Sequence, residues 1–261
     1  MIEYIVFDHK TQGCGCPLMG ATVMFELNLE KKWIDAVYTR SSVRRYKGAP
    51  DKAQLDSLGV LCRKLSWQGI KVRMFKGPGL KSQIKGTDVY AVIIAKRGTP
   101  MEVEGFMGEA LVLEATSMGL GTCWLGAGFY PDIINRNVDL QTDEAVHCVI
   151  AIGKADLPPF NPKRKDLVKL CGMDEAQLGA LGVWQKDAVL AARVAPSAVN
   201  LQPWKIVADK TSVSILEAAT IYKKYAPLDR GICMLHAAVG ALKAGRTVTW
   251  KKVDGGYAMR A

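Results

Sequence analysis

The chain has little of the material from which disulfide frameworks and metal sites are built. It contains three histidines and seven cysteines among 261 residues. Scattered cysteines in a chain of this length exclude a small disulfide scaffold, and a structural zinc site usually takes four well-spaced ligands. Cys14 and Cys16 form a lone Cys-Gly-Cys, so no metal is predicted. Four other cysteines lie in apolar stretches and should be buried free thiols: Cys62, Cys123, Cys148 and Cys233.

Long hydrophobic runs are also missing. No apolar stretch approaches the roughly 20 residues that a membrane-spanning helix needs. The first residues include Asp8, His9 and Lys10 and lack the basic-then-apolar pattern of a secretory leader. With 49% hydrophobic and 23% charged residues, the composition is typical of a soluble globular protein of one large or two small domains. We therefore expect a cytoplasmic protein without a membrane partner.

Acidic residues are fewer than basic ones, 25 against 35, which gives a net charge of +10. Such an excess can attract nucleic acid, but it can equally attract a cofactor phosphate or a nicotinamide dinucleotide. No helix-turn-helix, RRM or zinc-finger pattern accompanies the basic residues, so no nucleic-acid partner is expected.

Hydrophobic periodicity predicts an α/β protein. Helices are expected at 30–38, 51–65, 104–118, 174–183, 185–194 and 229–244, and strands at 72–75, 89–95, 146–152, 204–208, 212–216 and 247–253. Asp51 is a typical N-cap, and the helix from 104 to 118 is apolar on nearly all sides. His236, inside an apolar helix, should be a satisfied core histidine.

The first motif with chemical potential is Arg40, Ser42 and Arg44, at alternate positions directly after a predicted helix. In an extended segment, side chains two residues apart point to the same side. Two guanidiniums and a hydroxyl on one side would grip a phosphate, since charge-assisted hydrogen bonds are worth roughly 1.5–3 kcal/mol each. The alternative is a solvated basic turn that leads to Lys47.

The second motif, Gly119–Gly128, carries four glycines around Thr122-Cys-Trp-Leu. Because these glycines follow a predicted helix, the motif is not a Rossmann fingerprint, and it lacks the Gly-Lys-Ser/Thr ending of a P-loop. A glycine-rich backbone can approach a flat ligand closely and direct N–H groups at it. An ordinary loop after a helix C-cap is the alternative.

The third motif places Ser197, Asn200 and Gln202 between Pro196 and Pro203. The prolines restrain the backbone, so the hydroxyl and amide groups are positioned in advance to read the polar edge of a ring. No Ser/His/Asp or Cys/His constellation accompanies the three motifs, and no catalytic side chain is predicted.

Together the three motifs resemble those of the FMN-dependent nitroreductase family, and most closely its TM nitroreductase branch, in which the motif order is rearranged. The resemblance begins near Leu29 and implies FMN as cofactor, NADH or NADPH as hydride donor, and chemistry at flavin N5. The implied FMN-binding residues are Arg40, Ser41, Ser42 and Arg44 at the phosphate, ribityl and pyrimidine side, Trp124, Leu125 and Gly126 along the ring, Arg164 and Lys165 at the phosphate, and Pro196, Ser197, Ala198 and Asn200, which match a segment supplied by the partner subunit in the family's dimers.

Ordinary members of that family are homodimers with an α/β sandwich fold and FMN at the subunit interface. The resemblance therefore implies a nitroreductase-like fold with two half-like lobes in one chain: an N-terminal extension at 1–28, a first lobe at 29–165 and a second at 166–261. Similarity between 51–60 and 174–183 fits an internal duplication. The chain would then be a monomeric pseudo-dimer that holds one FMN, with further homo-oligomerisation left open.

The implied activity is reduction of nitroaromatics, quinones or similar electron-poor small molecules by ping-pong hydride transfer. Two alternatives stay open: a non-catalytic flavin-binding protein for storage or sensing, and a basic interaction module that has lost flavin. Likeness of fold does not identify the acceptor.

Overall fold

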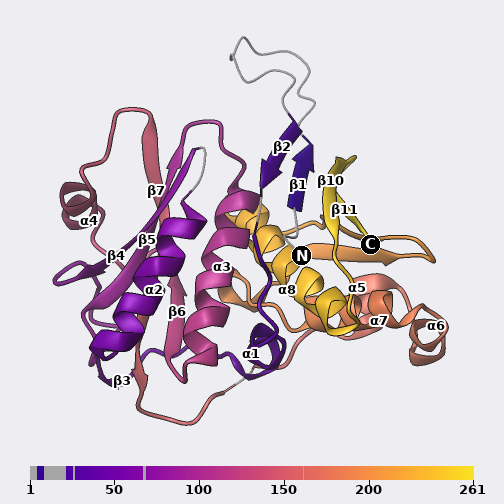
Figure 1. Cartoon of the computed structure of the whole chain (residues 1–261), viewed down its shortest axis with the longest axis horizontal. Helices are drawn as coiled ribbons and strands as arrows, with labels where there is room; N and C mark the ends of the chain where they lie inside the picture. The colour runs from indigo at the N-terminus through magenta and orange to yellow at the C-terminus, as the bar shows by residue number, and fades with distance from the viewer. Residues whose placement is uncertain (1–4, 9–21, 26, 67–68, 161) are drawn as a thin grey trace. The chain divides into compact units, whose positions relative to one another are not determined.

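The computed structural model describes residues 5–8, 22–25, 27–66, 69–160 and 162–261, so Cys14 and Cys16 lie outside the described residues. The chain divides into two compact units (Figure 1). Unit 1 comprises Met1–Ile34 and Arg164–Ala261, and unit 2 comprises Asp35–Lys163. Residues 29–34, which the sequence analysis places in the first lobe, group with the C-terminal part of the chain. The second boundary between the units falls between residues 163 and 164, whereas the predicted boundary between the lobes lies between 165 and 166.

Unit 2 is built on an antiparallel sheet with strand order β3-β7-β5-β4, in which β6 also pairs with β7. Its strands are β3 (Tyr46–Gly48), β4 (Ile70–Lys76), β5 (Val89–Lys96), β6 (Gly121–Leu125) and β7 (Glu144–Ala155). Its helices are α2 (Lys52–Leu65), α3 (Met101–Ser117) and α4 (Pro131–Val138), while α1 (Trp33–Thr39) carries the boundary between the units.

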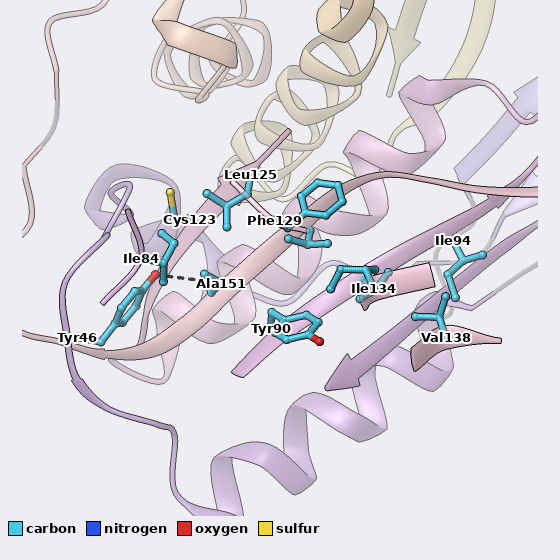
Figure 2. Close-up of a cluster of buried hydrophobic side chains, with 12 residues drawn as sticks. Tyr46, Ile84, Tyr90, Ile94, Cys123, Leu125, Phe129, Ile134, Val138 and Ala151 are labelled. Carbon is cyan, nitrogen blue, oxygen red and sulfur yellow. Dashed lines mark hydrogen bonds between the residues drawn. The ribbon is translucent and has the colours of Figure 1, made fainter. Parts of the chain in front are cut away.

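One side of the unit 2 sheet is covered by a hydrophobic cluster that includes α4 (Figure 2). Alternate residues of β5, namely Tyr90, Val92 and Ile94, face this cluster, as the period of two in a strand requires. The phenol of Tyr46 lies at its edge, where the hydroxyl donates a 2.6 Å hydrogen bond to Val43 O. Burial raises the pKa of Tyr46 well above its ordinary value.

The helices α2 and α3 pack on each other, and α2 also packs on β4 (Figure 1). The predicted N-cap of α2 is confirmed: Asp51 accepts from Gln54 N at 2.9 Å, and Gln54 Oε1 accepts from Asp51 N at 3.0 Å, which completes a capping box. In α3 every side-chain position from Glu102 to Ala115 is buried, as its apolar sequence predicts.

Unit 1 contains a second antiparallel sheet, of order β10-β11-β9-β8, and a separate two-stranded pair, β1 with β2. Its strands are β1 (Ile5–Asp8), β2 (Thr22–Phe25), β8 (Trp204–Ala208), β9 (Val213–Glu217), β10 (Thr249–Val253) and β11 (Gly256–Arg260). Its helical segments are α5 (Leu167–Cys171), α6 (Glu175–Gly179), α7 (Val183–Arg193), η1 (Ala198–Asn200), η2 (Lys223–Tyr225) and α8 (Ala226–Lys243).

The two long helices of unit 1, α7 and α8, approach closely at Gly240. A Cβ there would collide with the backbone of Asp187 and Ala188, so only glycine permits this crossing. Nearby, His236 is fully buried, with Nδ1 3.2 Å from Ala191 O, which confirms the expected core histidine.

The predicted helices and strands are all present, β8 with the predicted ends and the others with shifted ends. The elements that were not predicted are β1, β2, β3, α4, β6, α5, η1, η2 and β11. The expected helix at 174–183 ends at Gly179 instead, and a new helix starts at Val183. The four cysteines predicted as buried thiols are confirmed, and Cys171 is a fifth. Within the described ranges, no helix combines the length and hydropathy that crossing a bilayer requires.

Candidate functional site

The Arg40 motif begins where α1 ends, with Arg40 N still bonded to Ala36 O at 2.9 Å. The sequence predicts that Arg40, Ser42 and Arg44 point to the same side, and it makes no prediction of how exposed each side chain is. Arg40 is only 4% exposed and turns into the protein, while Ser42 and Arg44 stay exposed. Arg40 Nη2 lies 3.4 Å from Ser42 Oγ, so these two side chains still meet. Ser41 is buried beside them.

The reason that Arg40 turns inward is a buried carboxylate on α3. Glu109 is fully buried, and its Oε1 lies 3.9 Å from Arg40 Nε. Its other oxygen, Oε2, accepts a 2.7 Å hydrogen bond from Trp124 Nε1 on β6. Burial lowers the pKa of the Arg40 guanidinium, and the Glu109 charge opposes that shift. A single carboxylate therefore joins the first and second motifs inside unit 2.

Backbone contacts bring the same two motifs together. Val43 N donates to Thr122 O at 2.8 Å, and Ser42 forms a parallel bridge with Thr122. A Cβ on Gly121 would press against Val43, so the glycine allows this close approach. The Arg40 motif is thus held along β6 by main-chain hydrogen bonds.

The sequence left an ordinary loop as an alternative for the glycine-rich segment, but residues 121–125 form the strand β6. The antiparallel partner β7 supplies the hydrogen bonds that make it a strand. Its side chains alternate: Trp124 points toward α3, where Gly108 leaves space for the indole, and Leu125 joins the hydrophobic cluster of Figure 2. Leu125 and Gly126 can therefore offer a ligand their backbone, while the Leu125 side chain belongs to the core.

Both Arg40 and Arg44 lie close enough to β6 for their charges to act on a side chain of this strand. Burial raises the pKa of the Cys123 thiol, and the positive charges of Arg44 and Arg40 oppose the shift. Cys123 lies between Thr122 and Trp124 on β6. Unit 2 therefore gathers Arg40, Arg44 and the Ser42 hydroxyl around one strand.

The third motif lies in unit 1, together with the basic pair at 164–165. Arg164 Nη1 donates to Asn200 Oδ1, and Arg164 Nε donates to Val194 O at 3.2 Å. Lys165 N donates to Gln202 Oε1 at 2.7 Å, and Lys165 Nζ donates to Gln202 O at 3.0 Å. The structure thus brings Arg164, Lys165 and Asn200 together, and the two basic residues brace the motif.

The centre of that motif, which we call the Ser197–Gln202 turn, has an unusual backbone. Val199, Asn200 and Gln202 have φ of 45°, 59° and 46°. This left-handed region is unfavourable for residues other than glycine, and most of all for a β-branched residue such as Val199. Ser197 Oγ accepts from Gln202 N at 2.8 Å, which closes the turn. Such strained segments cluster at binding and catalytic sites.

A buried acid at the start of α8 also contacts the turn. Asp229, 3% exposed, accepts from Ala198 N with both carboxylate oxygens, at 3.0 and 3.1 Å. Burial raises the pKa of Asp229 to about 7, against the opposing effects of the Ala198 hydrogen bond and the Arg230 charge.

The sequence favoured a structural role for Glu109, in agreement with its buried contacts, whereas sequence reasoning missed the contacts of Asp229 and His147. The available signal was an acid in an otherwise apolar helix, since a charged side chain is rarely buried without a partner. His147, to which no role was assigned, contacts the buried Glu104 carboxylate through Nδ1 at 2.9 Å. In the part of the chain that the structure describes, no three metal-ligating side chains gather into a candidate metal centre.

Comparison with known proteins decides the family. A family model described as "Putative TM nitroreductase" matches residues 32–241. The chain belongs to this nitroreductase family. Membership supports a general oxidoreductase role for the protein, and the expected family resemblance is confirmed.

Solved structures agree on the fold. A nitroreductase from Thermotoga maritima is similar with a TM-score of 0.66 and 24% identity, over 87% of this chain and 93% of that chain. A nitroreductase with bound FMN from Desulfitobacterium hafniense is similar over 52% of this chain and 96% of its own, with 16% identity and a TM-score of 0.42. Nitroreductase A from Vibrio parahaemolyticus covers 57% of this chain and 77% of its own, with 16% identity and a TM-score of 0.44. No curated protein matches the chain. The Thermotoga maritima structure confirms the nitroreductase-like fold.

Proposed function

We propose that this TM nitroreductase is an FMN-dependent NAD(P)H oxidoreductase that reduces nitroaromatics, quinones or similar electron-poor acceptors by ping-pong hydride transfer. The observation that carries the proposal is the hydrogen bond from Val43 N to Thr122 O, which holds the Arg40 motif along the glycine-rich strand β6. Two sequence motifs that family resemblance assigns to one cofactor are adjacent in space within unit 2.

The residues around β6 fit the phosphate-bearing side of FMN. A phosphate monoester is a dianion near neutral pH and is best bound by guanidinium and hydroxyl donors. Ser42 and Arg44 are exposed, and Arg40 Nη2 lies 3.4 Å from Ser42 Oγ. We assign the phosphate contact to Ser42 and Arg44, and we assign to the buried Arg40 the support of Ser42.

The backbone around Trp124 and the Ser197–Gln202 turn fit the isoalloxazine side by the chemistry of their donors, while family resemblance assigns Arg164 and Lys165 to the phosphate. Trp124 and the glycines around it offer a backbone that a flat ring can approach, since Gly126 adds no side chain. The Ser197–Gln202 turn offers hydroxyl and amide groups on a fixed backbone. Arg164 and Lys165 hold that turn and keep positive charge next to it.

When bound, FMN supplies the redox chemistry, accepting hydride at N5 from NADH or NADPH and passing it to the acceptor, while the protein supplies position and electrostatics. No acid or base on the protein is required by this scheme. We propose one FMN per chain, because each of the three motifs occurs once in the sequence.

The visible spectrum of the purified protein, with the released chromophore identified and counted, tests the cofactor. Flavin bands from one FMN per chain support the proposal. NADH and NADPH oxidation with a quinone or a nitroaromatic then tests turnover. Bound flavin without oxidation of NADH or NADPH would indicate a storage or sensing protein. A colourless protein that does not bind added FMN would refute the proposal.

A further inference from the structure

The Ser197–Gln202 turn would not hold its backbone conformation without outside support. A left-handed conformation is unfavourable for most residues other than glycine and asparagine, and both Val199 and Gln202 adopt it beside Asn200. Val199 is 69% exposed, so packing of its own side chain does little to compensate. Strained backbone of this kind persists only where the surroundings over-determine it.

Three side chains from outside the turn and one within it act on its backbone or its amides. Arg164 binds the Asn200 side chain. The Lys165 ammonium donates to the backbone carbonyl of Gln202, and the Lys165 backbone N–H donates to the side-chain amide oxygen of Gln202. Ser197 Oγ closes the turn internally. Asp229 acts on the first residue of η1, since both of its oxygens accept from Ala198 N.

We propose that Asp229 is a positioning residue of the flavin site, whose carboxylate fixes Ala198 and so sets the Ser197–Gln202 turn in the conformation that binds FMN. The inference deepens the proposed function and rests on it. The inference follows from the position of the Asp229 carboxylate. Asp229 lies on α8, a helix whose side chains from Leu228 to Ala241 are buried, and its carboxylate accepts a hydrogen bond from the backbone N–H of the first residue of η1. A rigid helix thereby supports a strained turn.

The chemistry of the contact distinguishes positioning from plain stabilisation. The carboxylate accepts from Ala198 N through a charge-assisted hydrogen bond, whereas the neutral amide oxygen of an asparagine accepts the same hydrogen bond more weakly. An asparagine, however, is neutral and escapes the cost of burying a charge. Asp229→Asn should therefore preserve the fold while weakening the contact that fixes the turn, so flavin affinity and fold stability should change in different ways.

The experiment compares the wild-type protein with Asp229→Asn and Asp229→Ala at about pH 8, with Asp187→Asn as matched control. Asp187 pairs with Lys243 at 3.0 Å on the same pair of helices, so its variant removes an equal charge away from the turn. Three quantities are measured on flavin-free protein: the Kd for added FMN, the urea unfolding midpoint, and the exchange rate of the Ala198 amide hydrogen.

We expect Asp229→Asn to weaken FMN binding at least tenfold and to speed Ala198 exchange, with an unfolding midpoint no lower than that of the wild type. Asp187→Asn should keep the wild-type Kd. An FMN affinity within twofold of the wild type in Asp229→Asn would overturn the inference while leaving the proposed function intact. A wild-type protein that binds no FMN would instead refute the proposed function. Asp229→Asn decides alone if Asp229→Ala does not fold.

Discussion

The indole N–H of Trp124 donates a 2.7 Å hydrogen bond to Glu109, a carboxylate with no exposed surface. The other oxygen of Glu109 faces Arg40, so one acid on α3 serves a tryptophan of β6 and an arginine from a segment far away in the sequence. Loss of the Glu109 carboxylate should therefore disturb both the Arg40 motif and the glycine-rich motif around Trp124.

Arg40→Met should destabilise the fold by roughly 3 kcal/mol, because it leaves the buried Glu109 charge without its counter-ion. The double variant Arg40→Met with Glu109→Gln should recover most of this loss, since a Gln side chain still accepts from Trp124 Nε1. Urea unfolding of the two single variants and the double variant measures the coupling. Strictly additive effects would show that the 3.9 Å pair contributes nothing.

Arg44→Ala should weaken FMN binding roughly 10- to 100-fold, as expected for the loss of a charge-assisted hydrogen bond to phosphate. Arg45→Ala is the matched control, because Arg45 is the next residue, carries the same charge and is also exposed. FMN titration of both variants gives the comparison. Equal losses would mean that net charge, and not a specific contact, governs binding.

Gly108→Ala should destabilise unit 2 by roughly 1–3 kcal/mol, because the new methyl group would collide with Trp124 and Ile93 in a packed interior. Gly59→Ala should instead stabilise the protein by roughly 0.5–1 kcal/mol. Gly59 lies inside α2, and the nearest atom to a new Cβ is Arg63 Nη1 at 3.9 Å. Thermal unfolding separates the pair, and a stabilising Gly108→Ala would contradict the packing described for Trp124.

Asp229 should make the stability of the protein depend on pH. Its pKa is about 7 in the fold and about 3.9 in an unfolded chain, so between these values the folded state holds a proton that the unfolded state has lost. Its contribution is therefore complete below about pH 4 and is lost as pH rises through 7. Relative to Asp229→Asn, the wild type should lose stability over this window, measured by urea unfolding at several pH values. A pH-independent difference between the two proteins would speak against a raised pKa.

Local patterns predicted the parts of the fold that local physics determines. Asp51 and the leucines after it specify α2, because capping and helical periodicity are encoded within a few residues. The same holds for β5, whose apolar run is buried on both sides. The three motifs were likewise found from short segments.

Directions of side chains depended on partners that no local pattern identifies. Alternation along an extended segment predicted a shared side for Arg40, Ser42 and Arg44, but it could not show that Arg40 is buried beside Glu109 on a distant helix. The glycines left an ordinary loop as an alternative at 121–125, whereas pairing with β7 makes this segment a strand. The contact between Asp229 and Ala198 joins elements that only the folded chain brings together. The roles of individual site residues and the chain's division into half-like lobes stay predictions.

The path of the chain through its two units has a consequence for synthesis. Unit 2 consists of one continuous segment, Asp35–Lys163, whereas unit 1 is made of Met1–Ile34 and Arg164–Ala261. On a ribosome, unit 2 has emerged completely while unit 1 still awaits most of its residues, and domains generally fold as they emerge. The inserted segment should therefore fold first, and its early collapse would shorten the loop that unit 1 must close before its own segments can meet.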